Sequence, residues 1–343
     1  MKHITKSILI LALFIIFFAK DSTKLSYLDE LTLKYQFDIF SWELQNLPKK
    51  TINVFKNNNL TESEVKTILE IGNESNDSQI ELYFEKTVSN EIKDKLEKNF
   101  LFPPLYLSLE KPPKVLIISP RNKIFQKKAL LIDNAIPLKE IIIIENAIDE
   151  KNLSSIILDT GGFAAYPSIV KKNKDYDFMI STVSHEWLHQ YLFFYPLGRS
   201  YFKGGEMVSI NETLADLFGQ EISKKNIKSY NSEDFFYSFM RETRLEVDEL
   251  LRLGKIFEAE KYMLDQTNVL QSKGYKIRKI NQAYFAFYGN YGSSPSSTHS
   301  FDLKLEELMN SYESFGDFLD EVKMIDHVDK FENLINLRAS QKK

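Results

Sequence analysis

The segment FMISTVSHEWLHQYLFFY, residues 178–195, carries the most informative pattern in this chain of 343 residues. Acidic residues precede the segment and Pro196 follows it, which are the signals of a helix start and a helix stop. Within the predicted helix, His185 and His189 stand four positions apart and therefore share one face. Both imidazoles can then point at one metal ion, at the distance of about 2.0–2.1 Å that is typical of zinc.

Glu186 directly follows the first histidine. From that position its carboxylate can reach a water on the metal without binding the metal itself. Zinc lowers the pKa of such a water to about 7, and a nearby carboxylate can take the proton and pass it to a leaving amine. The pattern therefore predicts hydrolysis of a carbonyl substrate with Glu186 as the general base.

A second motif begins at Ser209 and reads SINETLAD. A catalytic zinc site needs three protein ligands and one open position, and Glu212, 23 positions after His189, is the candidate for the third ligand. Pro196 and several glycines lie in the interval, so one helix can end and an antiparallel helix can return. Asp216 lies on the same helix face as Glu212 and can accept a hydrogen bond from a ligating imidazole. Together the motifs predict one zinc ion per chain.

Each motif also has a plainer explanation. Two histidines and a glutamate can occur by chance on a solvated helix face. Ser209 and Glu212 fit a capping box, in which Glu212 would start the second helix instead of binding a metal.

His-Glu-x-x-His followed by Asn-Glu-x-x-x-Asp resembles the active site of the thermolysin-type zinc peptidases, the gluzincins. The resemblance is limited to residues 185–216, and the acidic calcium-binding cluster of thermolysin is not visible in the sequence. The resemblance implies a zincin-like core and peptide hydrolysis. It also implies the following roles: His185, His189 and Glu212 as metal ligands, Glu186 as base, and Asp216 as the partner of a ligating histidine.

A donor to the oxyanion is expected in residues 278–299, because a tetrahedral intermediate needs a hydrogen-bond donor besides the metal. Tyr284 and Tyr288 stand four apart on a predicted helix, Tyr291 follows in a glycine- and serine-rich stretch, and His299 ends the region. Tyr288 is the first choice. Packing of these tyrosines with the neighbouring phenylalanines in a core is the alternative.

Substrate binding is expected at Gly161, Gly162, Phe163 and Ala164, ahead of the motif helix. Peptidases commonly bind an extended chain at a sheet edge, where glycine permits close approach of two backbones. An ordinary glycine turn is the alternative. This segment contains no aspartate or glutamate that could bind a free amino terminus. In an aminopeptidase, Glu206 could serve that role.

Composition narrows the possible classes of protein. Hydrophobic residues make up 43% of the chain, which is enough for a substantial core. The net charge of −4 gives no reason to expect a nucleic-acid partner. Because the chain has no cysteine, disulfides are excluded and any metal must be bound by His, Asp or Glu.

Residues 1–24 have the pattern of a signal sequence or membrane anchor. Lys2 and Lys6 precede an uninterrupted apolar run over residues 8–19, and such a run predicts export. The protein is then secreted if the segment is cleaved, or attached to the membrane with its body outside the cytoplasm if the segment is retained. A buried N-terminal helix is the alternative.

The remaining chain predicts an α+β fold, with a small sheet followed by a mostly helical zincin-like catalytic core. Residues 25–100 show helical periodicity, and the catalytic domain is expected over 101–343. Within it, the sheet is placed at about 101–170, the active-site helices at about 177–225, and a helical part at 230–343. Four runs are predicted as strands: Leu105–Leu109, Val115–Ser119, Ile141–Ile144 and Ser155–Leu158.

The sequence thus favours an exported or membrane-anchored zinc peptidase whose partner is a peptide or protein substrate. Two alternatives stay open: a zinc aminopeptidase or other amide hydrolase on the same site, and a non-catalytic membrane-tethered binding or scaffold protein. The oligomeric state is left undetermined.

Overall fold

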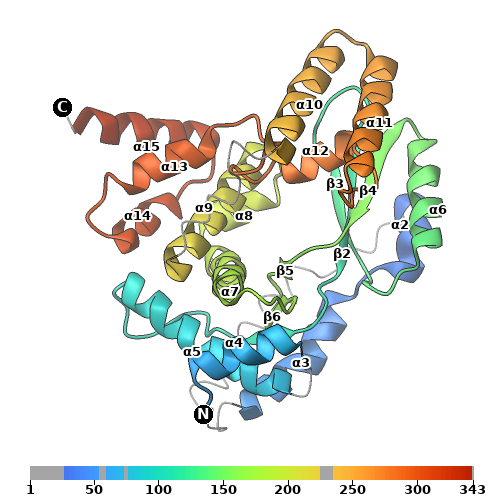
Figure 1. Cartoon of the computed structure of the whole chain (residues 1–343). Coiled ribbons are helices and arrows are strands. Elements are labelled where there is room, and N and C mark those ends of the chain that lie inside the picture. The colour runs from blue at the N-terminus through green and yellow to red at the C-terminus, as the bar shows by residue number, and fades with distance from the viewer. Residues whose placement is uncertain (1–26, 54–58, 73–75, 225–234, 342–343) are drawn as a thin grey trace.

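A computed structural model describes residues 27–53, 59–72, 76–224 and 235–341 (Figure 1). These residues form a mostly helical α+β fold with short strands, which confirms the predicted fold class at this level. The expected signal or anchor at residues 1–24 lies outside the described residues. Of the helices within them, none has the length and hydrophobicity needed to cross a bilayer.

The N-terminal part is helical, as the periodicity of residues 25–100 predicts. Helix α5 shows why: its residues at spacings of four are fully buried on one face, from Ile80 through Phe84 to Ile92. The elements of this part are α2 (Tyr27–Thr32), η1 (Leu33–Tyr35), α3 (Ile39–Asn53), α4 (Glu62–Ile71) and α5 (Asp77–Lys95).

The strands form two sheets of three strands each, where one small sheet was expected. The first is antiparallel, in the order β3 (Lys128–Ile132), β2 (Lys114–Pro120), β4 (Leu153–Leu158). In the second, the central strand β6 (Ser168–Val170) runs parallel to β1 (Leu107–Leu109) and antiparallel to β5 (Gly162–Phe163).

The predicted strand Ile141–Ile144 is wrong, because these residues belong to helix α6 (Leu138–Asp149). Ile141 and Ile144 are buried against the first sheet, whereas Ile142 and Ile143 are 44% and 46% exposed. Burial of residues three positions apart is typical of a helix. In a run that consists only of isoleucines, this spacing cannot be seen from the sequence.

The two motif helices lie side by side at the centre of the molecule (Figure 1). Helix α7 (Tyr176–Leu192) is capped at its N-terminus by Asp175, whose carboxylate accepts a hydrogen bond from the Phe178 amide at 3.0 Å. The short α8 (Pro196–Tyr201) turns the chain, and α9 (Glu206–Ser223) returns. Trp187 of α7 packs against Phe218 of α9 in the largest hydrophobic cluster.

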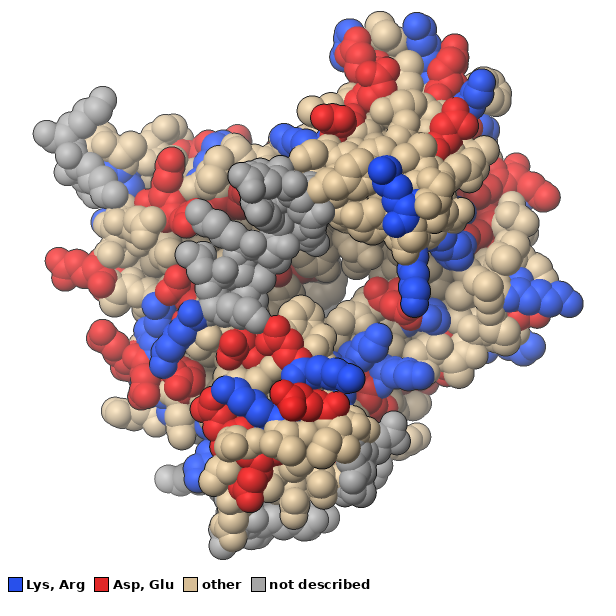
Figure 2. Space-filling view, viewed as in Figure 1, with Lys and Arg blue, Asp and Glu red and all other residues tan. Residues whose placement is uncertain are grey.

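The C-terminal part is helical as well. The hairpin of α10 (Phe235–Arg252) and α11 (Ile256–Ser272) projects at the upper right of Figure 1, and α12 (Gln282–Tyr288) packs on β2 and β4. Helix α13 (Phe301–Met309) packs on α9, followed by α14 (Phe315–Val322) and α15 (Val328–Gln341). Figure 2 shows acidic and basic side chains interspersed on the displayed face.

Three of the four outer sheet edges are covered. Carboxylates of α5 accept hydrogen bonds from the outward-facing amides of β1. The Leu107 amide nitrogen, for example, lies 2.8 Å from Glu85 Oε1. Glu145 covers β4 in the same way at Ile157, and the backbone of residues 35–37 pairs with β3. In the part of the chain that the structure describes, the outer edge of β5 has no strand beside it.

Candidate metal centre and active site

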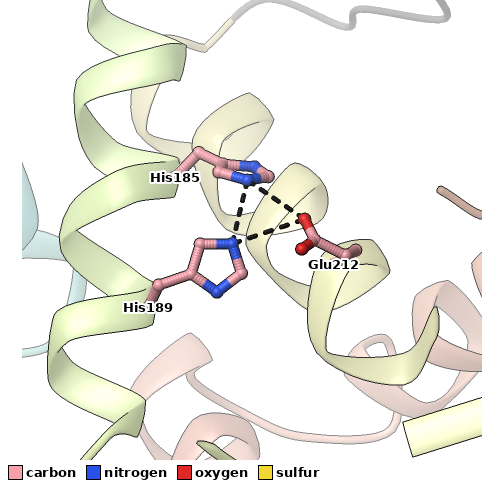
Figure 3. A group of neighbouring side chains, drawn as sticks. All are labelled: His185, His189 and Glu212. Carbon is pink, nitrogen blue, oxygen red and sulfur yellow. Dashed lines mark hydrogen bonds and ion pairs between the residues drawn. The ribbon is translucent and has the colours of Figure 1, made fainter. Parts of the chain in front are cut away.

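Two histidine nitrogens and one carboxylate oxygen converge on a single point between α7 and α9 (Figure 3). Nε2 of His185 lies 3.0 Å from Nε2 of His189, and each nitrogen lies 3.4 Å from Oε2 of Glu212. Ligands on a tetrahedron of radius about 2.05 Å are separated by about 3.3 Å. The three atoms therefore have the spacing of ligands on one metal ion.

The other nitrogen of each imidazole is bonded to an acceptor. Nδ1 of His185 lies 3.0 Å from Asp216 Oδ1, and Nδ1 of His189 lies 2.8 Å from Asn211 Oδ1. The Asn211 amide group donates to Leu197 O at 3.4 Å, so its Oδ1 is an acceptor and Nδ1 of His189 carries the proton. When both imidazoles are neutral, this arrangement directs an unprotonated Nε2 of each ring inward.

The convergence of these atoms calls for a cation. With both imidazoles neutral, the two nitrogens and the carboxylate oxygen are all acceptors, and their close approach is favourable only if a positive charge, a proton on a ring or a metal ion, lies among them. Burial opposes a charge on His185, but hydrogen bonds to Asp216 and Glu212 outweigh it and raise the pKa of His185 well above its usual value. Burial likewise opposes ionisation of Glu212, yet the two histidines hold the pKa of Glu212 well below its usual range. The donor set fits a metal ion.

Glu186 lies beside the edge strand β5. Its side chain is 7% exposed, and burial raises the pKa of Glu186 above its ordinary value against the opposing histidine charges. A Cβ atom placed on Gly162 would fall 2.2 Å from Glu186 Oε1. Only glycine therefore allows the strand and the carboxylate to pack in this way, which brings the predicted base and the predicted substrate-binding segment together.

The backbone of Gly162 is directed toward the open edge. The Lys171 amide donates to Gly161 O at 2.9 Å, and the next pair along the ladder is Gly162 with Val170. Pairs in an antiparallel ladder alternate between bonded and non-bonded, so the N–H and C=O groups of Gly162 point away from β6. These two groups face the open edge of β5, next to Glu186.

The segment after β5 is fixed to α7 and α3. Gln190, which follows His189, donates to Ala165 O and, at 2.9 Å, to Ser168 Oγ. The Tyr166 amide donates to Glu43 Oε1 of α3 at 2.9 Å. The edge strand and the motif helix are therefore positioned as one unit.

The predicted oxyanion donors Tyr284, Tyr288 and His299 make other contacts in the structure. Tyr284 and Tyr288 pack on each other, with ring centroids 4.5 Å apart, and join the hydrophobic cluster of α12 and the first sheet. Nδ1 of His299 lies 3.6 Å from Glu206 Oε1, and its ring stacks on Phe301. Core packing accounts for the two tyrosines, and Glu206 is engaged with His299.

Two other tyrosines lie at the site. The Tyr201 hydroxyl donates to Glu212 Oε1 at 2.9 Å. Tyr291 lies close enough to Glu212 that burial and this carboxylate raise the pKa of Tyr291 well above its usual value. The Gly292 amide donates to Thr213 Oγ1 at 3.0 Å, which docks the loop carrying Tyr291 onto α9 beside Glu212. The sequence motifs do not include Tyr201. Its position in the short connection between the two motifs was the signal that could have identified it.

The capping-box alternative for Ser209 and Glu212 is wrong. Helix α9 begins at Glu206, so Ser209 is inside the helix, where its hydroxyl lies 3.3 Å from Asn290 Oδ1. Glu212 is a buried residue of the helix interior.

Comparison with known proteins gives no match: no family model, no curated protein and no solved structure is significantly similar to this chain. Function has to be inferred from the site itself.

Proposed function

We propose that this chain is a zinc-dependent peptidase. The observation that supports the proposal most strongly is the convergence of three acceptor atoms, from His185, His189 and Glu212, at the separations of metal ligands. Two imidazoles and one carboxylate with an open fourth position are the ligand set of catalytic zinc in several peptidases. The resemblance of residues 185–216 to the gluzincins favours the same metal and a zincin-like core.

The roles of the chain's own residues follow from their positions. Zinc, when bound, would polarise the scissile carbonyl and make a bound water more acidic. Glu186, next to the first proposed ligand, would accept a proton from that water and deliver it to the leaving nitrogen. Asp216 and Asn211 hold the two imidazoles in orientation. The Tyr291 hydroxyl, which makes no hydrogen bond within the described residues, is available to the oxyanion.

An extended peptide is the substrate that the open edge favours. The N–H and C=O groups of Gly162 can pair with a substrate backbone and so place its scissile bond beside Glu186. The apolar run at residues 8–19 supports a location outside the cytoplasm, with the body either secreted or attached to the membrane.

The test combines metal analysis and proteolysis of the purified protein. Wild type is expected to bind about one zinc per chain and to cleave an unfolded protein substrate. Glu212→Ala should lose most of its zinc, whereas Glu186→Gln should keep its zinc and lose about 10²–10⁴-fold in turnover. Cleavage of peptides with blocked amino termini separates an endopeptidase from an aminopeptidase. Wild type without zinc would exclude the mechanism and favour the scaffold alternative.

A further inference from the structure

Tyr201 contacts the oxygen of Glu212 that does not face the histidines. Its hydroxyl lies 2.9 Å from Oε1, while Oε2 is the atom at 3.4 Å from both imidazoles. The two oxygens of one carboxylate therefore have different partners. The Tyr201 ring also stands edge-on to the His189 ring, with centroids 6.0 Å apart.

The short helix that carries Tyr201 is fixed to both ligand helices. A Cβ atom on Gly198 would lie 2.1 Å from the Leu192 carbonyl oxygen, so α8 packs directly against the end of α7. On the other side, Leu197 O accepts the hydrogen bond from Asn211 of α9. Ser200 Oγ donates to Asp326 O at 3.1 Å, and the Leu197 amide donates to Lys323 O at 3.1 Å. Tyr201 is thus held by packing that does not depend on a metal.

A carboxylate can bind a metal ion through one oxygen or through both. If Glu212 used both oxygens, the metal would have four protein donor atoms and a bound water would be its fifth ligand, whereas a catalytic zinc site usually has three protein ligands and water as the fourth. A hydrogen bond from a phenol to an ionised carboxylate is strong in a buried setting and competes with the metal for that oxygen. The contact of Tyr201 with Oε1 therefore favours coordination through Oε2 alone.

We infer that Tyr201 is a positioning residue that would hold Glu212 to the metal through one oxygen, so that water would be the fourth ligand and not the fifth. The inference rests on the metal site of the proposed function. It also gives the two tyrosines different roles: Tyr201 bonds to Glu212, and Tyr291 faces the substrate.

The test is the visible spectrum of the cobalt-substituted protein, because the d–d bands of cobalt weaken as its coordination number rises above four. Tyr201→Phe removes only the hydroxyl. We expect this variant to bind cobalt at the wild-type stoichiometry with an absorptivity lower by about threefold. Circular dichroism and the unfolding midpoint show whether the variant is folded.

Tyr312→Phe is a matched control. The hydroxyl of Tyr312, in the turn between α13 and α14, donates to Glu321 Oε2 at 2.7 Å, which is the same type of hydrogen bond from a tyrosine to a carboxylate. This variant should keep the wild-type cobalt spectrum.

Two results would overturn the role of Tyr201. One is a cobalt spectrum of Tyr201→Phe identical to that of wild type. The other is a folded Tyr201→Phe protein that no longer binds cobalt, which would make Tyr201 a determinant of affinity instead of coordination. A wild type that binds cobalt with four ligands but cleaves no peptide would refute the peptidase and leave the role of Tyr201 intact.

Discussion

Nδ1 of His189 donates to Oδ1 of Asn211 across 2.8 Å, and this hydrogen bond determines which nitrogen of the ring faces Glu212. Asp216 does the same for His185 at 3.0 Å. The two acceptors stand five positions apart on α9, with the proposed ligand Glu212 between them. One helix therefore carries one of the three proposed ligands and the orienting partners of the other two.

The first prediction concerns these orienting partners. Asn211→Ala and Asp216→Ala should each weaken zinc binding by about 10–100-fold, because the freed imidazole can rotate or change tautomer. Zinc affinity is measured by competition with a chromophoric chelator. Ser223→Ala, at the far end of the same helix, serves as the control. Unchanged affinity in both variants would show that the rings are oriented by packing alone.

The second prediction concerns Gly162. Gly162→Ala would place a methyl group 2.2 Å from Glu186 Oε1, so either the carboxylate or β5 must shift. We expect turnover to fall by about 10²-fold while zinc content is kept, because a displacement of about 1 Å in a reacting group has this effect. Gly161→Ala should be far milder, since a Cβ there meets no atom within 4 Å. Equal losses in the two variants would contradict the proposed contact.

The third prediction concerns the pH dependence of stability through Glu43. Burial, opposed only by the hydrogen bond from Tyr166, raises the pKa of Glu43 from 4.5 to about 7. Between these pH values the unfolded chain ionises Glu43 and the folded protein does not, so the free energy of unfolding falls as pH rises and levels off above pH 7.

Glu43→Gln removes this loss and leaves an amide oxygen to accept the Tyr166 hydrogen bond. The difference in unfolding free energy between the variant and wild type should increase by about 3 kcal/mol between pH 4.5 and pH 8, at about 1.4 kcal/mol per pH unit. Urea unfolding at several pH values measures it. A difference that does not change with pH would show that Glu43 titrates normally.

The fourth prediction concerns metal binding and folding. Zinc at about 100 times its dissociation constant should add about 2.7 kcal/mol to the stability of the folded protein, if the unfolded chain does not bind it. Denaturant unfolding with and without zinc measures the increase, and Glu212→Ala should show much less of it. An equal increase in this variant would place the bound zinc at another site.

The sequence predicts the parts of the site that depend on helical spacing. His185 and His189 face one point because residues four apart share a helix face, and Glu212 and Asp216 repeat that spacing on α9. The α+β class follows equally from periodicity. Helical spacing does not select Tyr201, or single out Tyr291 among the candidate donors, because their positions depend on how the short helix α8 and an irregular loop pack on α9. The division into two sheets depends on pairing between distant segments, which local patterns do not report.

The open strand β5 comprises two residues, Gly162 and Phe163. Exposed strands recruit other strands, and proteins limit this by keeping such strands short. A second copy of this chain would gain too few hydrogen bonds at β5 to assemble into a continuous sheet. The same shortness means that a peptide bound there must find most of its affinity in side-chain contacts outside the strand, so an inhibitor that imitates only the backbone should bind weakly.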